Sequence, residues 1–251
     1  KVKVKLLSWP AKNKSPYGGV IEVLGMPGTM DVDMNVILAE NGFPTKFPKE
    51  VEAEADAICD GENVEIIGIM EHIEPCGIHS GDSACCLPSI SLSDDALALI
   101  RHWSEALATT LKVQGLINLQ FAVQRAADGE EKVFIIEANP RASRTVPFVA
   151  KATGVPLARL ATRLMAGETL SQVGLLKEPV PPLQSVKEAV LPFRRFPGAD
   201  SLLGPEMRST GEVMGSASDF GMAFAKAELA AGEALPTAGT VFLSTHDRDK
   251  A

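Results

Sequence analysis

Residues 116–139, LINLQFAVQRAADGEEKVFIIEAN, contain the pattern that decides the fold. Two runs rich in aliphatic and aromatic residues flank Asp128-Gly129, a dipeptide typical of a tight hairpin turn. A two-residue turn at that point places Gln120 directly opposite Glu137. Since alternate residues of a strand share one face, Asn139 points the same way as Glu137. The sequence therefore predicts an antiparallel hairpin with one carboxylate and two amide oxygens at one end.

These oxygen-bearing side chains suggest a cation site. Carboxylate and amide oxygens suit Mg²⁺ that is held jointly with nucleotide phosphates. Arg141 and Arg144 follow the hairpin and could neutralise charge on a transferring phosphoryl group. The same residues also fit an ordinary hairpin with a polar end, whose arginines pair with nearby acids. The pattern by itself leaves both interpretations open.

The rest of the chain mixes alternating polarity, typical of strands, with helical periodicity. The clearest helix follows Ser93, which can cap it, and its leucines and isoleucine at 97, 100, 107 and 111 are expected to pack in the core. Residues 77–89 are small and polar and are expected to form a loop. We predict strands at 1–9, 20–25, 54–61, 63–73 and 239–244, and helices at 30–42, 96–113, 155–167 and 220–232.

Charge and cysteine content limit the classes of function. The net charge is −8, but residues 1–50 carry seven Lys and Arg against five Asp and Glu, so the remainder carries −10. This acidity argues against nucleic-acid or lipid binding over the whole surface. No apolar run approaches about 18 residues and no signal peptide is visible, so no membrane span is expected. The four cysteines lack CxxC spacing, which predicts reduced thiols in a cytoplasmic protein and no zinc site.

Four segments together resemble the large subunit of carbamoyl-phosphate synthetase, in its second ATP-grasp half, which phosphorylates carbamate. They are DAICDGENVEIIGIMEHIEPCGIHSGDSACCLP, GLINLQFAV, FIIEANPRASRTVPFVAKATGVPLARLA and LGPEMRSTGEVMG. The resemblance covers about residues 50–245. It implies an α+β fold, in which an antiparallel ATP-grasp sheet is flanked by helices. It also implies transfer of the γ-phosphoryl of ATP to carbamate with Mg²⁺ or Mn²⁺, and a glutaminase small subunit as partner.

The resemblance implies roles for particular residues. Metal ligands would be Gln120, Glu137 and Asn139, and the first two would also contact the nucleotide. Glu52 would bind the ribose, and Arg141 and Arg144 would lie beside the transferred phosphate. A loop formed by Gly77, Ile78, His79 and Ser80 would touch the nucleotide. His79 also fits a loop histidine held by a backbone hydrogen bond. For His72, His102, Cys85 and Cys86 we expect structural roles, and we interpret LGPEMRSTGEVMG as support for the fold.

The first residues resemble a different family. KVKVKLLSWPAKNKSPYGGVIEVLG followed by NGFPTKFPKEVEAEADA is similar to the cold-shock-like region that precedes the catalytic domain of ribonuclease R. Asp31 and Asp33 precede that domain, so ribonuclease activity is not expected. The two resemblances meet between about residues 50 and 57. We therefore expect three parts: an OB-like β segment at 1–50, a partial ATP-grasp domain at 51–238, and the start of a regulatory domain at 239–251.

Three hypotheses follow for the function. The Gly-rich phosphate loop of the synthetase family is not legible in residues 1–49, so we expect weak nucleotide binding and little turnover by this chain alone. The basic N-terminal segment could instead bind single-stranded RNA, with Trp9, Tyr17 and Phe43 as stacking candidates. The third hypothesis is that the chain has no activity and that its exposed strand edges favour association.

Overall fold

The computed structural model describes residues 2–8, 17–23, 51–125, 129–196 and 198–233. The chain divides into two compact units, residues 1–48 and 49–251, and each is considered by itself. The helix expected at 30–42 and the strand expected at 239–244 lie outside the described residues, as do Trp9, Asp31, Asp33, Phe43 and the expected segment 239–251.

In the first unit, two strands form an antiparallel pair. β1 (Val2–Ser8) pairs with β2 (Tyr17–Val23), and Val2 lies opposite Val23. β1 was expected from the alternation of charged and apolar residues, and β2 from the apolar run that follows Gly18-Gly19, although β2 begins three residues earlier than predicted.

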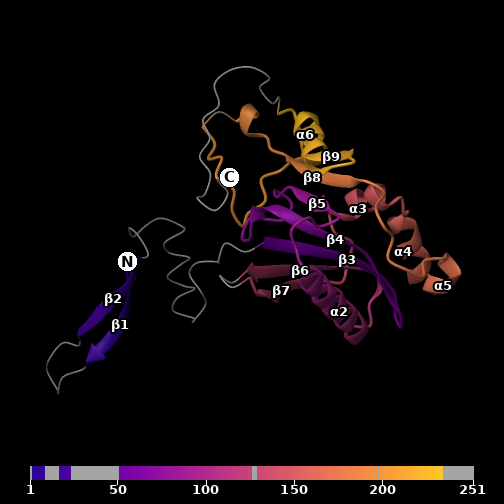
Figure 1. Cartoon of the computed structure of the whole chain (residues 1–251), viewed down its shortest axis with the longest axis horizontal. Coiled ribbons are helices and arrows are strands. Elements are labelled where there is room, and N and C mark those ends of the chain that lie inside the picture. The colour runs from indigo at the N-terminus through magenta and orange to yellow at the C-terminus, as the bar shows by residue number, and fades with distance from the viewer. Residues whose placement is uncertain (1, 9–16, 24–50, 126–128, 197, 234–251) are drawn as a thin grey trace. The chain divides into compact units, whose positions relative to one another are not determined.

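The second unit is built on a seven-stranded sheet, with strand order β7-β6-β3-β4-β5-β8-β9 (Figure 1). Every neighbouring pair is antiparallel, which confirms the predicted sheet type. The strands are β3 (Val51–Asp60), β4 (Val64–Pro75), β5 (Cys85–Leu87), β6 (Gln114–Arg125), β7 (Glu131–Asn139), β8 (Gln184–Val190) and β9 (Gly211–Ala217). β5 lies inside the segment that was expected to be a loop, because tertiary pairing with β4 and β8 orders these three residues.

The predicted hairpin is formed by β6 and β7, and its register has two parts. Gln120 lies opposite Glu137, as predicted. The expected two-residue turn is wrong, however, because beyond the site Phe121 pairs with Ile135 and Arg125 with Glu131. An extra residue in β7, a β-bulge, separates the two registers.

The helices are α2 (Asp94–Thr110), α3 (Val146–Thr153), α4 (Leu157–Met165), the short α5 (Leu170–Val173), the 3₁₀ helix η1 (Phe193–Arg195) and α6 (Phe220–Ala231). The Ser93 side chain accepts a hydrogen bond from the Ala96 amide and caps α2, as expected. α3 was not predicted, and α4 is shorter than the predicted helix at both ends. In the described part of the chain, no helix combines the length and apolarity needed to cross a membrane.

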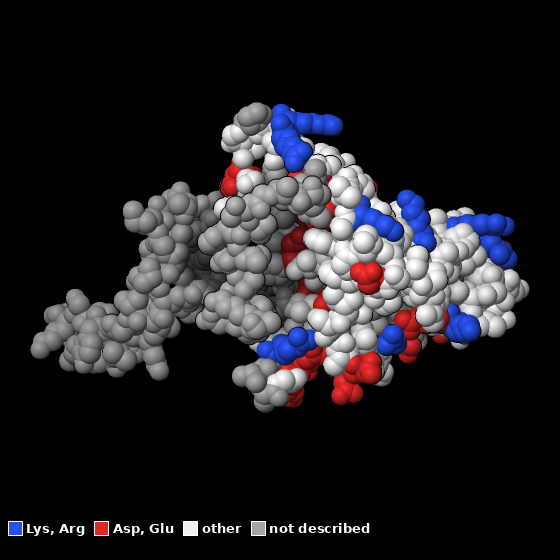
Figure 2. All heavy atoms as spheres, turned by 45° about the horizontal axis from the view of Figure 1, so that its top comes forward, with Lys and Arg blue, Asp and Glu red and all other residues white. Residues whose placement is uncertain are grey.

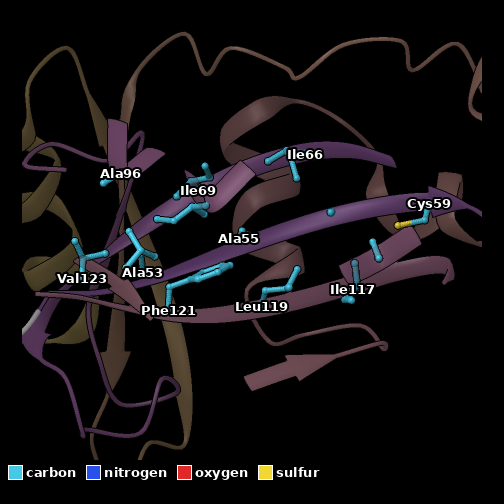
Figure 3. Packing of buried hydrophobic residues seen from close by; sticks show 14 of the residues in the cluster. Ala53, Ala55, Cys59, Ile66, Ile69, Ala96, Ile117, Leu119, Phe121 and Val123 are labelled. Carbon is cyan, nitrogen blue, oxygen red and sulfur yellow. The ribbon is translucent and has the colours of Figure 1, made fainter. Parts of the chain in front are cut away.

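One face of the sheet packs against α2 through unusually small side chains. Ala53, Ala55 and Ala57 of β3 are fully buried there, together with longer residues of β4 and β6 (Figure 3). Ala96 and Ala108 face them from α2. Ile100 is buried as predicted, and Leu97 and Leu107 pack at the margin of this core. The prediction for Leu111 is wrong: it follows the last turn of the helix and is 51% exposed.

The opposite face is only partly covered by helices. α3, α4 and α5 bury Ile58, Ile67, Met70 and Cys85 in a second apolar cluster. Cys86 points to the other face of β5, where α6 packs on it and on β8 and β9 in a third cluster. Cys85 and Cys86 are fully buried, which confirms the expectation that they pack in the core. The remaining part of the α3–α5 face carries polar side chains, and the candidate site lies there.

Candidate nucleotide and metal site

A row of acids on β3 forms the floor of the site. Glu52, Glu54 and Asp56 alternate with the buried alanines and therefore point away from α2. Glu54 lies opposite Gln120 of β6, and Asp56 lies opposite Asn118. All three acids are at most 4% exposed. Buried carboxylates need partners, because leaving a charge unpaired away from water is costly.

The predicted metal ligands lie beside this row. Gln120 and Glu137 are paired across the hairpin, and Asn118 and Asn139 form the next pair on the same face. Glu137 is exposed, and no donor in the described part of the chain hydrogen-bonds to its carboxylate. This donor set consists of a carboxylate and amide oxygens, which fits a hard divalent cation.

The two candidate arginines are exposed at the end of the hairpin. Arg141 donates to the Asn139 side-chain oxygen at 3.4 Å and to the Ala142 carbonyl at 3.1 Å. Among the described residues, no carboxylate lies within ion-pair distance of Arg141 or Arg144. The alternative that these arginines serve to pair with acids is therefore not supported.

Asp56 ties the strand that carries the acids to the segment that carries the arginines. Its carboxylate accepts hydrogen bonds from Asn118 at 2.8 Å, Thr145 at 2.8 Å and Ser143 at 3.0 Å. Burial raises the pKa of Asp56 to about 6, against the opposing effect of these hydrogen bonds. Ser143 and Thr145 flank Arg144, so this network fixes the backbone from which Arg144 projects.

His72 lies within β4 and faces the acid row, a position that sequence reasoning missed. Its two ring nitrogens are 3.8 Å from Glu52 and 3.9 Å from Glu54, too far for hydrogen bonds, and neither nitrogen has a hydrogen-bond partner in the described residues. The three side chains offer ligand atoms within 4.8 Å of one another and so form a second candidate set of metal ligands. The Lys187 ammonium nearby already balances part of their charge.

Glu52, the expected ribose ligand, lies at the edge of the loop that was expected to touch the nucleotide. It is 4% exposed, and the Gly77 backbone and the Cys76 side chain lie close enough to its carboxylate to lower its pKa. Burial raises the pKa of Glu52, partly opposed by the charge of His72. The structure therefore brings Glu52 and Gly77 together.

The loop itself is held from several sides. His79 Nδ1 accepts a hydrogen bond from the Gly81 amide at 3.0 Å, the backbone contact that the alternative interpretation expected. A neutral imidazole then carries its proton on Nε2, which remains available as a donor. Ser80 Oγ accepts from Gln120 at 3.3 Å, and the Ser80 and Ser83 carbonyls accept from Lys187 at 3.3 and 2.7 Å. Ile78 is half-buried, and His102 lies exposed on α2.

The segment LGPEMRSTGEVMG also contacts this loop, beyond the general support expected of it. Asp82 accepts from the backbone amides of Arg208 and Ser209 at 2.7 and 2.8 Å. The Gly204 carbonyl accepts from the His79 amide at 2.8 Å. This segment therefore fixes the backbone on both sides of Ser80. Sequence spacing could not show this, because the partners are more than 120 residues apart.

Positive and negative charges are mixed on one face of the second unit. On the face in Figure 2, the described Lys and Arg side chains are separated by acidic and uncharged residues. The described residues on this face therefore form no continuous basic patch of the kind typical of nucleic-acid binding.

Solved structures with a similar fold define the class of this domain. The biotin carboxylase domain of a single-chain bacterial carboxylase matches 67% of this chain and 45% of its own, with a TM-score of 0.51 and 21% identity. The urea carboxylase of Kluyveromyces lactis matches 75% of this chain and 18% of its own, with a TM-score of 0.54 and 16% identity. These likenesses concern the fold, which is of the ATP-grasp type.

Sequence comparison then identifies the family. Residues 37–173 match the model of the carbamoyl-phosphate synthase L chain, ATP binding domain, and the chain belongs to this family. The carbamoyl phosphate synthase large chain of Nostoc sp. is 62% identical over 202 residues, which cover 80% of this chain and 18% of that protein. The corresponding protein of Vibrio cholerae is 57% identical over 199 residues, 79% of this chain and 18% of its own. The chain thus spans about 18% of the length of these relatives.

The first unit matches another family. Residues 1–48 match the model of the cold shock domain. The resemblance to the synthetase is thereby confirmed at the level of the family, and the N-terminal resemblance is confirmed as one to a cold shock domain.

Proposed function

We propose that this chain binds ATP together with Mg²⁺ or Mn²⁺ and contributes to phosphoryl transfer onto carbamate. The observation that carries the proposal is the pairing of Gln120 with the exposed Glu137, with Asn139 next on the same face. Identity of about 60% to carbamoyl phosphate synthase large chains supports the choice of reaction. In such an enzyme, we infer, a glutaminase small subunit is the partner.

The roles of the residues follow from their chemistry. Gln120, Glu137 and Asn139 would hold the cation, which when bound neutralises phosphate oxygens and aligns them for transfer. The Arg141 and Arg144 guanidinium groups, which have no carboxylate partner in the described residues, would stabilise charge on the transferring group. The His79 imidazole and the Ser80 hydroxyl would contact the nucleotide, and Glu52 would bind the ribose hydroxyls. Alignment and charge neutralisation suffice for this reaction, so no protein nucleophile is needed.

A calorimetric titration of the full chain with Mg-ATP tests this proposal. We expect a dissociation constant no tighter than micromolar, because the Gly-rich loop is not legible in the sequence. Glu137→Ala should abolish the binding heat, because it removes the carboxylate that anchors the cation. Glu105→Ala is the matched control: it removes an exposed carboxylate from α2, on the other side of the sheet, and should bind as the unmodified chain does. Absence of heat at millimolar ATP would contradict the proposal.

RNA binding by the first unit is the second candidate, favoured by the cold shock domain match over residues 1–48. Proteins that bind single strands combine basic charge with aromatic stacking. We expect any RNA retardation in a gel to weaken with salt and to be lost in Trp9→Ala/Tyr17→Ala. Binding that persists in this double variant, or that does not respond to salt, would argue against this function.

A further inference from the structure

Gln120 has a side chain with two chemically different ends, and only one of them can serve a cation. The amide oxygen is a metal ligand, whereas the amide nitrogen carries two protons and would repel a cation. A glutamine ligand therefore works only when something fixes which end faces the site.

In this fold, Glu54 determines which end of the Gln120 amide faces the site. Its Oε1 accepts a hydrogen bond from Gln120 Nε2 at 2.9 Å. An ionised carboxylate can only accept, so the NH₂ end of Gln120 must face Glu54. Ser80 Oγ lies 3.3 Å from the same nitrogen but cannot make the choice, because a hydroxyl group both donates and accepts.

The surroundings hold the Glu54 carboxylate in place. Glu54 is 2% exposed, and His72 Nε2 lies 3.9 Å from its Oε1. Lys187 lies on the same side of the sheet and is itself held by the Ser80 and Ser83 carbonyls. The acceptor that orients Gln120 is thus fixed within the folded unit.

We propose that Glu54 is a positioning residue, which turns the Gln120 amide oxygen toward Glu137 and so prepares it to bind the cation. This inference rests on the proposed function, because it assigns a metal to Gln120. Glu54 acts through Gln120 and is not itself a ligand of the cation that Gln120, Glu137 and Asn139 would hold. Residues that orient metal ligands in this way commonly affect metal affinity by 10- to 100-fold.

The test is a titration of the full chain with Mn²⁺ alone, in which electron paramagnetic resonance reports free Mn²⁺. In Glu54→Gln, the new amide can donate to the Gln120 oxygen and hold it away from the site, so we expect the dissociation constant to rise by about tenfold. Exchanging the two residues, in Glu54→Gln/Gln120→Glu, restores a donor facing an acceptor without changing the net charge. We expect this exchange to return the affinity to within about threefold of the unmodified chain, a rescue that a merely structural role for Glu54 does not predict.

Glu137→Ala distinguishes a failure of the positioning role from a failure of the proposed function. If Glu137→Ala weakens Mn²⁺ binding and Glu54→Gln does not, the positioning role is wrong and the proposed function stands. If Glu137→Ala leaves Mn²⁺ binding unchanged, the proposed metal site and the positioning role both fail. Circular dichroism checks that each variant is folded. If Glu54→Gln does not fold, the exchange variant provides the test. An exchange variant that folds and binds Mn²⁺ supports the positioning role of Glu54, whereas one that folds but does not bind Mn²⁺ overturns it.

Discussion

Replacing Lys187 with Met is expected to lower the free energy of unfolding of the second unit by about 3–5 kcal/mol. Lys187 is 1% exposed, and its ammonium donates to the Ser80 and Ser83 carbonyls. Its charge also helps to keep Glu54 ionised. Methionine fills a similar volume but leaves two carbonyls without this donor and a buried carboxylate without its cation. Chemical denaturation followed by circular dichroism gives the loss.

Lys226→Met is the matched control for this experiment. Lys226 also donates to a backbone carbonyl, that of Ser216 at 2.8 Å, but it is exposed, so water can replace the lost contact. We expect Lys226→Met to lower the free energy of unfolding by less than about 1 kcal/mol. Adding Glu54→Gln to Lys187→Met should cost less than the two single changes together, because the uncompensated charge disappears. A cost for Lys187→Met no larger than that of the control would show that the buried charge is balanced by other groups.

Gly215→Ala is expected to displace α6 from the sheet, at a cost of about 3 kcal/mol or more. A Cβ at this position of β9 would lie 2.2 Å from the Ala223 carbonyl oxygen and 2.5 Å from the Ala227 nitrogen. Both are backbone atoms of α6, so no change of rotamer can relieve the overlap. Hydrogen exchange should show faster exchange of the α6 amides, together with the loss of stability.

The same strand provides the control for this prediction. A Cβ on Gly211 would meet nothing within 4 Å, and neither glycine requires a positive φ. Gly211→Ala should therefore change the stability by less than about 0.5 kcal/mol. If Gly215→Ala proved equally mild, the close approach of α6 to β9 would be contradicted.

Part of the hairpin formed by β6 and β7 could be predicted from the sequence, and part could not. The opposition of Gln120 and Glu137 could be predicted, because the apolar runs and the turn dipeptide are local signals. The predicted turn was nevertheless wrong by one residue, and the bulge in β7 compensated for the error. Bulges depend on how a strand fits its neighbours and on local twist, and nothing in the hairpin sequence marked this one.

The acids of β3 show what alternation alone could not reveal. EVEAEADA at residues 50–57 predicts a strand with one polar face, and such a face usually meets water. Here β3 lies in the sheet between β4 and β6, so its polar face is buried against His72 and Gln120. The short elements β5 and α3 were missed for a related reason, since tertiary contacts rather than local propensity stabilise them. The resemblance to the synthetase family supplied the roles of Glu52 and His79, which no local pattern indicated.

The alanines beneath the acid row have a consequence for the accuracy of the site. A methyl group has no rotamers, so the contact between α2 and β3 through Ala53, Ala55 and Ala57 has almost no alternative packing arrangements. Larger side chains at these positions could adopt several rotamers, and each rotamer would set a slightly different distance between β3 and α2. The backbone of β3 therefore has little freedom to shift relative to α2. The positions of the carboxylates on its other face are thus determined by the smallest residues in the core rather than by the largest.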